Sequence, residues 1–309
     1  MQVLESIDEQ EIERLRAAEE YFWLDLHDPT VEQIAELARL FNIHPVAVED
    51  LEDFGQRPKI DDYEDFLHIV YFGVEDSEPV EIHILVHGDS LVTVRRDGCR
   101  PLMDLRSRIE PLDPSREEYA LYKVLDTLTD SFFPLLEKLD DAIEEAEDRV
   151  VERGGRAFDL EAVIALRRRL SRLRRIVFPM RDMLAGAGDF VDRVPGLRSE
   201  EAHDYYRDVY DHLLRIGDSI ESYRDVLTSL HDIYLSAQSN RLNEVVYRLT
   251  VVGTIFLPIT FITGFFGQNF GWLVDGIKSE AAFFGLGIGL EVLAVAALLV
   301  WFRRAGVRE

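Results

Sequence analysis

Two long apolar stretches near the C-terminus constrain the fold of this chain more than any other feature. Leu249–Phe266 contains no formally charged residue, and Ala281–Phe302 contains only Glu291. Each approaches the roughly 20 apolar residues that a helix needs to cross a bilayer. Buried helices of a water-soluble core are the alternative, but the short segment Gly267–Glu280 between the stretches favours a membrane hairpin. We therefore expect two transmembrane helices and a lipid bilayer as a partner.

The charges beside this hairpin predict its orientation. Arginines flank its two outer ends, at Arg241, Arg248, Arg303, Arg304 and Arg308, whereas the connecting loop holds one lysine and two acids. By the positive-inside rule, both termini and the tail 303–309 are cytoplasmic and the loop 267–280 is external. The acidic N-terminus shows no signal peptide pattern. We expect a multi-pass protein of the cell (inner) membrane.

Residues 1–100 carry the patterns of an α/β domain. Short runs of β-branched and aromatic residues predict strands at Tyr21–Leu26, Phe66–Gly73, Val80–Gly88 and Ser90–Arg96. An amphipathic helix follows Thr30, which is a suitable N-cap. This part is expected to lie in the cytoplasm.

After Pro101 the patterns become helical. Three long helices are predicted near residues 114–153, 157–187 and 199–266, punctuated by Gly154, Gly155, Pro195 and Gly196. The first helix ends in acidic residues and the second is rich in arginine, so we expect 101–198 to form an antiparallel hairpin held by opposite charges.

The third helix should run without interruption from Ser199 into the first membrane span. At 1.5 Å per residue it would be roughly 100 Å long. Apolar residues follow a heptad seam at Val209, Leu213, Ile216, Ile220, Tyr223, Leu227, Leu230 and Tyr234. This stalk helix therefore packs against helices of its own chain or of sister chains.

A second heptad series on the same helix is acidic and continues into small or polar positions of the span. Its members are Asp204, Asp211, Asp218, Asp225 and Asp232, followed by Ser239, Val246, Gly253 and Thr260. In a ring of parallel helices, such a stripe could face the axis and offer oxygen ligands to hydrated Mg²⁺. The upper aspartates could instead form only a solvated face. For Asp232, nearest the membrane, we favour the axis.

The overall charge narrows the choice of partners. The formal net charge of −25 arises from 59 acidic and 34 basic residues, which argues against nucleic acid and favours cations, although acidity can also serve solubility alone. The single cysteine, Cys99, excludes an intramolecular disulfide framework. The sequence contains no His-Glu-x-x-His motif, phosphate loop or nucleophile paired with a base, so we do not expect an enzyme.

Several segments together resemble the CorA family of magnesium channels. They are His44–Lys59 (HPVAVEDLEDFGQRPK), Tyr206–His212 (YRDVYDH), Asp232–Thr250 (DIYLSAQSNRLNEVVYRLT), Thr254–Gly267 (TIFLPITFITGFFG) and Gln268–Phe270 (QNF). The resemblance covers nearly the whole chain. It implies a homopentameric funnel with a cytoplasmic α/β domain, a long stalk helix that becomes the pore lining, and a second, peripheral transmembrane helix.

The resemblance also implies a pore motif. The family signature at the outer pore mouth is Gly-Met-Asn, so Gly267 and Asn269 match and Gln268 departs. In the family, five Asn side chains surround a hydrated ion, which suits Mg²⁺ because it dehydrates reluctantly. The departure at Gln268 leaves the ion preference open. Along the stalk and first span, the implied pore positions are Asp232, Asn243, Val246, Leu249, Gly253, Leu257 and Thr260.

By motif position, Asp50 and Asp208 correspond to the paired carboxylates of a regulatory Mg²⁺ site between neighbouring protomers. Such acidic subunits repel one another, and a divalent ion between facing carboxylates offsets that repulsion. High internal Mg²⁺ would hold the ring shut. Mg²⁺ is thus expected both as substrate and as regulator.

Three functions remain open from the sequence. The leading hypothesis is a channel for hydrated Mg²⁺, with Co²⁺ and Ni²⁺ as further substrates. A proton-coupled Zn²⁺ transporter is motivated by Gln268 and by Glu291, a charge near the middle of the second span. A membrane scaffold that does not conduct is the third. We expect Glu291 to be neutral and hydrogen-bonded.

Overall fold

The computed structural model forms two compact units, Met1–His231 and Asp232–Glu309, which are described separately. It describes residues 1–109, 117–152, 159–185 and 200–304. Three of the expected landmarks lie outside the described residues. They are the break at Gly154 and Gly155, the break at Pro195 and Gly196, and the end of the tail 303–309.

The first unit is built on a six-stranded sheet in the order β1-β2-β6-β5-β4-β3. The strands are β1 (Gln2–Leu4), β2 (Phe22–His27), β3 (Lys59–Asp62), β4 (Leu67–Glu75), β5 (Glu78–Val86) and β6 (Ser90–Arg95). The β1–β2 and β2–β6 pairs are parallel and the other three are antiparallel. The four strands expected from the sequence are confirmed, and the two edge strands β1 and β3 are additional.

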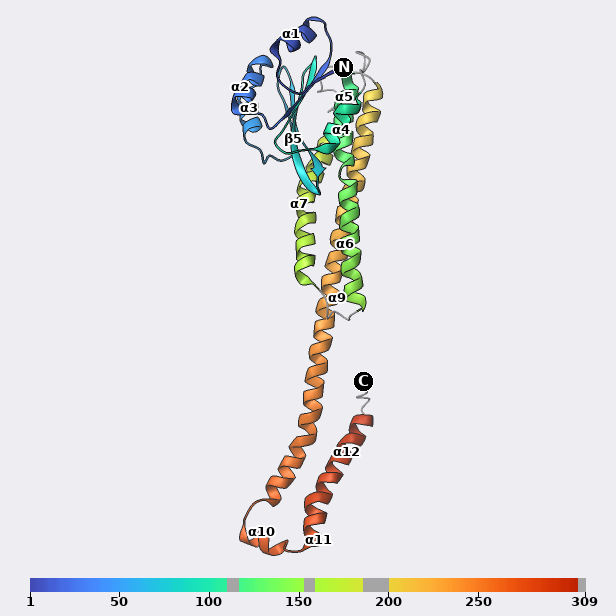
Figure 1. Ribbon diagram of the computed structural model, residues 1–309. Coiled ribbons are helices and arrows are strands. Elements are labelled where there is room, and N and C mark those ends of the chain that lie inside the picture. The colour runs from blue at the N-terminus through green and yellow to red at the C-terminus, as the bar shows by residue number, and fades with distance from the viewer. Residues whose placement is uncertain (110–116, 153–158, 186–199, 305–309) are drawn as a thin grey trace. The chain divides into compact units, whose positions relative to one another are not determined.

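Helices cover both faces of this sheet (Figure 1). On one face lie α1 (Glu9–Ala17), α2 (Val31–Leu40) and α3 (Pro45–Glu52), which share a core with β2 and β6. The Thr30 cap of α2 is confirmed as a capping box with Gln33. The other face packs against α4 (Arg100–Arg108) and the long helices that follow.

The long helices differ from expectation in one respect. The helix predicted over 114–153 is wrong as a single element, because it is broken into α5 (Glu117–Asp130) and α6 (Phe133–Glu152). Pro134 has no N–H to continue the helix, and it is tolerated in the first turn of α6. Just before it, the Ser131 hydroxyl accepts a hydrogen bond from the Val74 N–H of β4, at 2.8 Å.

The helices α7 (Leu160–Leu184) and α9 (Glu200–Phe266) confirm the other two predicted patterns. From Val209 to Leu230, the apolar seam of α9 packs within its own chain, in one core with α5, α6 and α7. The expected charge pairing between α6 and α7 is wrong for the described residues, where no ion pair joins them. Instead Arg174 pairs with Glu221 of α9 at 2.6 Å, and Arg172 lies 3.8 Å from Glu78.

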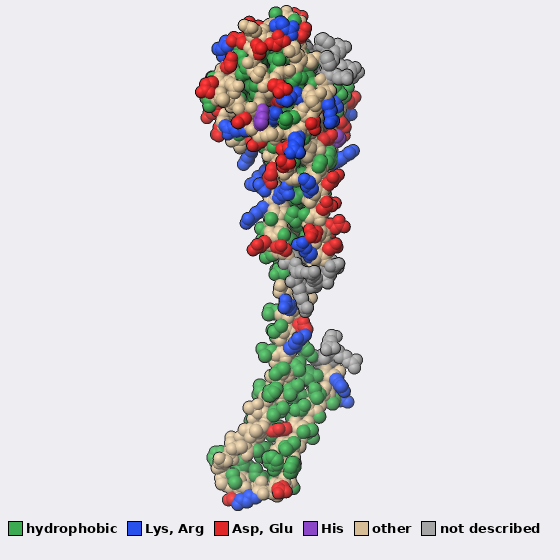
Figure 2. Space-filling view, in the orientation of Figure 1, with side chains coloured by type: hydrophobic (Ala, Val, Ile, Leu, Met, Phe, Trp, Pro, Cys, Tyr) green, Lys and Arg blue, Asp and Glu red, His purple; other side chains and the backbone are tan. Residues whose placement is uncertain are grey.

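The second unit contains the end of α9 and the remaining helices. These are α10 (Gly271–Gly276), α11 (Glu280–Ala282), the π-helix η2 (Phe283–Gly289) and α12 (Leu290–Arg304). Two helical stretches, His203–Phe266 and Glu280–Arg304, are long and apolar enough to cross a membrane. Hydrophobic side chains form much of the visible surface of this unit, whereas charged side chains are frequent on the first (Figure 2).

Candidate functional site

The pore positions expected on α9 share one helical face. From Asn243 to Thr260 they are spaced by three or four residues, and Asp232 lies three turns before Asn243 on the same face. All seven are exposed in the chain: Asp232, Asn243, Val246, Leu249, Gly253, Leu257 and Thr260. We call them the α9 stripe. The Thr260 hydroxyl donates to the Phe256 carbonyl at 2.8 Å, which leaves its lone pairs facing outward.

The Gly-Gln-Asn segment lies between α9 and α10. The Gly267 N–H donates to the Thr263 carbonyl at 2.9 Å and the Gln268 N–H to the Phe265 carbonyl at 3.3 Å. A Cβ at Gly267 would lie 3.0 Å from the Thr263 carbonyl oxygen, so the tight exit from the helix favours glycine there. Asn269 follows with an exposed side chain. The N-cap position of α10 is occupied by the next residue, Phe270, and not by Asn269.

Glu291 of α12 is hydrogen-bonded to the first span, and its expected neutral state stays a prediction. The Thr263 hydroxyl oxygen lies 2.6 Å from Glu291 Oε1 and 2.9 Å from the Ile259 carbonyl oxygen. The Thr263 hydroxyl is the donor to Glu291, and it also lies within hydrogen-bond distance of the carbonyl one turn earlier in its own helix. The contact links the two candidate spans through a side-chain hydrogen bond.

Asp208 belongs to a group of potential metal ligands between α5 and α9. His212 Nε2 lies 3.9 Å from Asp208, and His212 Nδ1 lies 2.9 Å from Asp130 and 3.8 Å from Asp126. The Tyr122 hydroxyl donates to Asp208 at 3.3 Å. Ligand atoms of Asp126, Asp208 and His212 lie within 4.8 Å of one another. Carboxylates and an imidazole at this spacing suit a divalent cation.

The electrostatics of the Asp208 group favour a cation. Burial, together with the negative charge of Asp130, raises the pKa of Asp126. Burial and the charges of Asp126 and Asp208 also raise the pKa of Tyr122. Lys123 lies 3.8 Å from Asp126, so it offsets only part of the negative charge. A bound dication would offset the rest.

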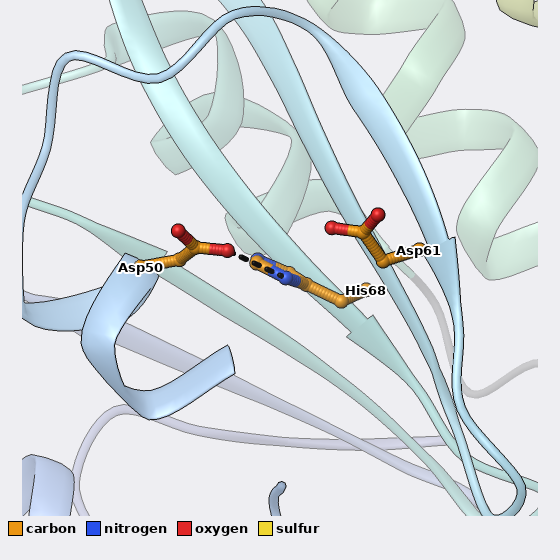
Figure 3. A group of neighbouring side chains, drawn as sticks. All are labelled: Asp50, Asp61 and His68. Atoms are coloured by element: carbon orange, nitrogen blue, oxygen red, sulfur yellow. Dashed lines mark ion pairs between the residues drawn. The ribbon is translucent and has the colours of Figure 1, made fainter. Parts of the chain in front are cut away.

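Asp50 lies in a different group, at the edge of the sheet. Its carboxylate oxygen lies 2.6 Å from Lys59 Nζ and 3.9 Å from His68 Nδ1. Lys59 also contacts Asp61 at 2.7 Å. Figure 3 shows how Asp50, Asp61 and His68 face one another from α3, β3 and β4. Asp50 thus already has a positively charged partner in its own chain.

Sequence reasoning singled out Asp50 and Asp208 but missed the residues around them. Asp126 and His212 come from different helices, and Asp61 and His68 from different strands, so no local spacing joins either pair. A histidine one turn after Asp208 was the only sequence signal for the α5–α9 group.

An α/β and helical part followed by two candidate spans, with grouped carboxylate and imidazole side chains, is the architecture expected of a membrane protein that binds divalent cations. The chain belongs to the CorA-like Mg²⁺ transporter protein family, whose family model matches residues 18–304. It is thus a member of a family of membrane transporters for divalent cations.

Individual relatives agree with this assignment. The cobalt/magnesium transport protein CorA of Thermotoga maritima is 32% identical over 88% of this chain and 78% of its own. The complete structure of the CorA magnesium transporter from Methanocaldococcus jannaschii matches with a TM-score of 0.76 and 25% identity, covering 91% of this chain and 90% of that one. The zinc transport protein ZntB of Yersinia pseudotuberculosis is 26% identical over 95% of this chain and 90% of its own.

Proposed function

We propose that five copies of the chain form a channel for hydrated Mg²⁺ in the cell (inner) membrane, with Co²⁺ and Ni²⁺ as further substrates. The observation that carries this proposal is the α9 stripe. It is exposed along a helix whose apolar seam is already covered within the chain, and it leads directly to Gly267, Gln268 and Asn269. Two spans per chain cannot enclose an ion path alone, so a ring of copies is required. Both termini would lie in the cytoplasm, as the positive-inside rule predicts.

Within such a ring, Asn269 would hold the ion at the outer mouth. Five exposed amide oxygens would contact the water shell of Mg²⁺, which avoids the cost of stripping that shell. Gly267, Gln268 and Asn269 would then be a variant of the family's Gly-Met-Asn signature. Val246, Leu249, Gly253 and Leu257 would form the apolar constriction, with Asn243 and Thr260 as polar steps and Asp232 as a ring of carboxylates at its inner end.

Asp50 and Asp208 would regulate the channel. We place a Mg²⁺ ion between Asp208 of one protomer and Asp50 of the next, where it would offset the repulsion between acidic subunits and hold the ring closed. The unsatisfied charge of the α5–α9 group supports the Asp208 side of this contact. On the other side, Asp50 would have to exchange Lys59 for the ion.

A proton-coupled Zn²⁺ transporter on the same scaffold is the second candidate. The observation that favours it is the contact of Glu291 with Thr263, which places an ionisable carboxyl group between the two spans. The departure at Gln268 and the similarity to a zinc transport protein point the same way.

Ion flux into liposomes tests these functions. We expect rapid Mg²⁺ uptake without a pH gradient and a loss of at least tenfold in Asn269→Ala, with the oligomer intact. Uptake of Zn²⁺ that depends on a pH gradient would favour the second candidate. No flux of any divalent cation would mean a scaffold that does not conduct.

A further inference from the structure

Three potential ligands meet at the outer edge of the sheet. Asp61 on β3 and His68 on β4 are direct cross-strand partners, so their side chains leave the same face of the sheet side by side. Asp50, near the end of α3, reaches the same point, with its carboxylate 3.9 Å from His68 Nδ1. Ligand atoms of all three lie within 4.8 Å of one another (Figure 3).

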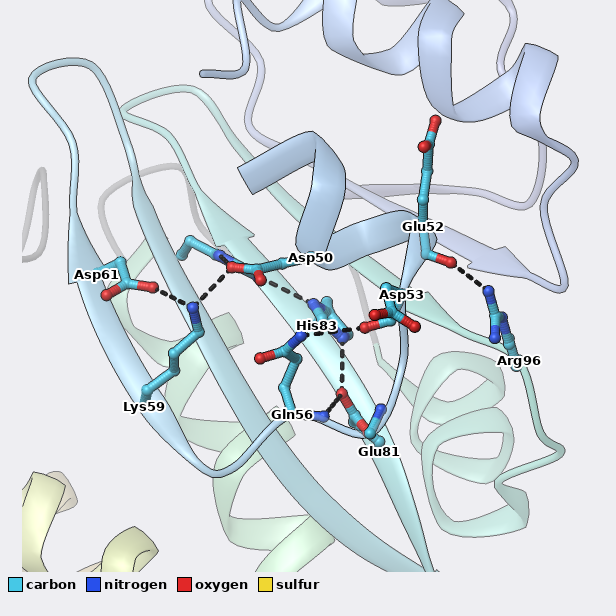
Figure 4. A network of polar contacts seen from close by, with 11 residues as sticks. Asp50, Glu52, Asp53, Gln56, Lys59, Asp61, Glu81, His83 and Arg96 are labelled. Carbon is cyan, nitrogen blue, oxygen red and sulfur yellow. Dashed lines mark hydrogen bonds and ion pairs between the residues drawn. The ribbon is translucent and has the colours of Figure 1, made fainter. Parts of the chain in front are cut away.

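A hydrogen-bonded relay from Glu81 through His83 to His68 determines which nitrogen of the His68 ring carries the proton. The Glu81 carboxylate accepts the N–H groups of Gly55 and Gln56 at 2.7 and 3.0 Å, and it lies 3.0 Å from His83 Nε2. His83 must therefore donate from Nε2. Its Nδ1 then accepts from His68 Nε2, 3.0 Å away. Figure 4 shows His83 between Glu81 and the Asp50 side of the network.

The relay leaves His68 Nδ1 with a free lone pair that faces the Asp50 carboxylate, 3.9 Å away. The His68 side chain is fully buried, and its Nδ1 has no hydrogen-bond partner in the described part of the chain. The hydrogen bonds to His83 and Glu81 place the ring proton on Nε2 and leave Nδ1 available as a ligand. A metal-bound histidine typically has this arrangement, with its other nitrogen held by a chain that ends in a carboxylate.

Lys59 already fills the cation position. Its ammonium bridges Asp50 and Asp61 at 2.6 and 2.7 Å. Burial opposes the charge on Lys59, but hydrogen bonds with both carboxylates outweigh it and raise the pKa of the lysine. The lysine side chain is about one third exposed, so it can swing out and make way for a metal ion.

We infer that Asp50, Asp61 and His68 form a binding site for a divalent transition metal such as Zn²⁺, Co²⁺ or Ni²⁺, which displaces Lys59. An imidazole nitrogen beside two carboxylates suits these ions, whereas Mg²⁺ prefers oxygen and water alone. The site shares Asp50 with the regulatory contact proposed above, but it requires neither conduction nor a second protomer. It would couple α3 to the sheet edge when such a metal is present.

Metal titration of the full-length protein in detergent tests this inference. All variants carry His212→Phe, which removes the imidazole of the α5–α9 group, and Zn²⁺ and Co²⁺ are the probes. We expect Co²⁺ to give a visible spectrum with nitrogen ligation, displaced by Zn²⁺ and not by a similar concentration of Mg²⁺. His68→Phe should weaken Zn²⁺ binding by roughly 10–100-fold. Lys59→Met should strengthen it by at least tenfold, because the competing ammonium is gone.

His87→Phe is the matched control. His87 is also a buried histidine with an unpartnered Nδ1, but it stacks on Phe66 and has no place among these ligands. Its Zn²⁺ affinity should equal that of the parent. Equal Zn²⁺ affinity in His68→Phe and the parent, or no gain in Lys59→Met, would overturn the inference. Because opposite changes are expected from two variants, misfolding cannot imitate the result, and Mg²⁺ flux measured in parallel would report separately on the proposed channel.

Discussion

At the residue scale, replacement of Asp208 can distinguish between two kinds of assembly. In one, a metal ion holds the protomers together, and in the other apolar packing alone does so. Asp208→Lys would place an ammonium beside Asp126 and Asp130, where it could supply the positive charge that the proposed Mg²⁺ brings. A change in assembly should alter the proteolysis of α9 beyond His231, because Arg241 and Arg248 are exposed there in the single chain.

We therefore expect trypsin to cut the wild type at Arg241 several-fold faster in EDTA than in Mg²⁺, and Asp208→Lys equally slowly in both. Closure of the variant channel should also be less sensitive to internal Mg²⁺. Asp211→Lys is the control, since Asp211 is exposed and lies outside the ligand group. Protection of the wild type that is independent of Mg²⁺ would remove the ion from the contact between protomers.

At the scale of elements, the hydrogen bond between Glu291 and Thr263 joins α12 to α9. Glu291→Gln keeps an acceptor oxygen on a side chain of similar shape, so it should preserve the stability of the detergent-solubilised protein and its Mg²⁺ flux. Glu291→Leu removes the bond and should cost about 1 kcal/mol, seen as a lower unfolding midpoint. If Glu291→Gln instead abolishes Zn²⁺ uptake driven by a pH gradient, Glu291 carries protons and the second candidate function is correct.

Elements with strong periodicity could be predicted from the sequence, whereas those formed by tertiary pairing could not. The unbroken heptads of α9 and the two apolar runs identify their helices directly. Strand β3 was missed because its sequence, Lys59–Asp62, is mostly charged and becomes a strand only through pairing with β4. The break after Asp130 was missed because Pro134 can begin a helix as readily as it ends one.

The candidate sites differ in the same way: contiguous motifs can be read from the sequence, whereas groups formed by tertiary packing cannot. Gly267 and Asn269 could be proposed as pore residues because they lie in one contiguous motif, and their role stays a prediction. The pairing of Asp61 with His68 depends on strand register, and a shift of one residue would turn His68 to the opposite face of the sheet. The α5–α9 group depends on how two helices pack. For these two groups the sequence holds a single local signal, the histidine one turn after Asp208.

At the scale of the whole molecule, the surfaces of α9 that are left uncovered in the single chain determine how copies can assemble. Its seam up to Leu230 is covered by helices of the same chain. Contacts between copies must therefore use other surfaces, and the exposed apolar residues of the second unit are available to them and to lipid. The central claim is that five such helices turn the α9 stripe toward a common axis.

Cysteine accessibility tests that claim most directly. In a Cys99→Ala background, Thr260→Cys places a thiol on the stripe, and Phe261→Cys places one on the next residue, about 100° around the helix. Both proteins should have a mass near five times the 35.6 kDa of one chain. A positively charged thiol reagent should block Mg²⁺ flux into liposomes at Thr260→Cys and leave Phe261→Cys unaffected. Equal sensitivity of the two positions, or a protein that is only monomeric or dimeric, would contradict the account.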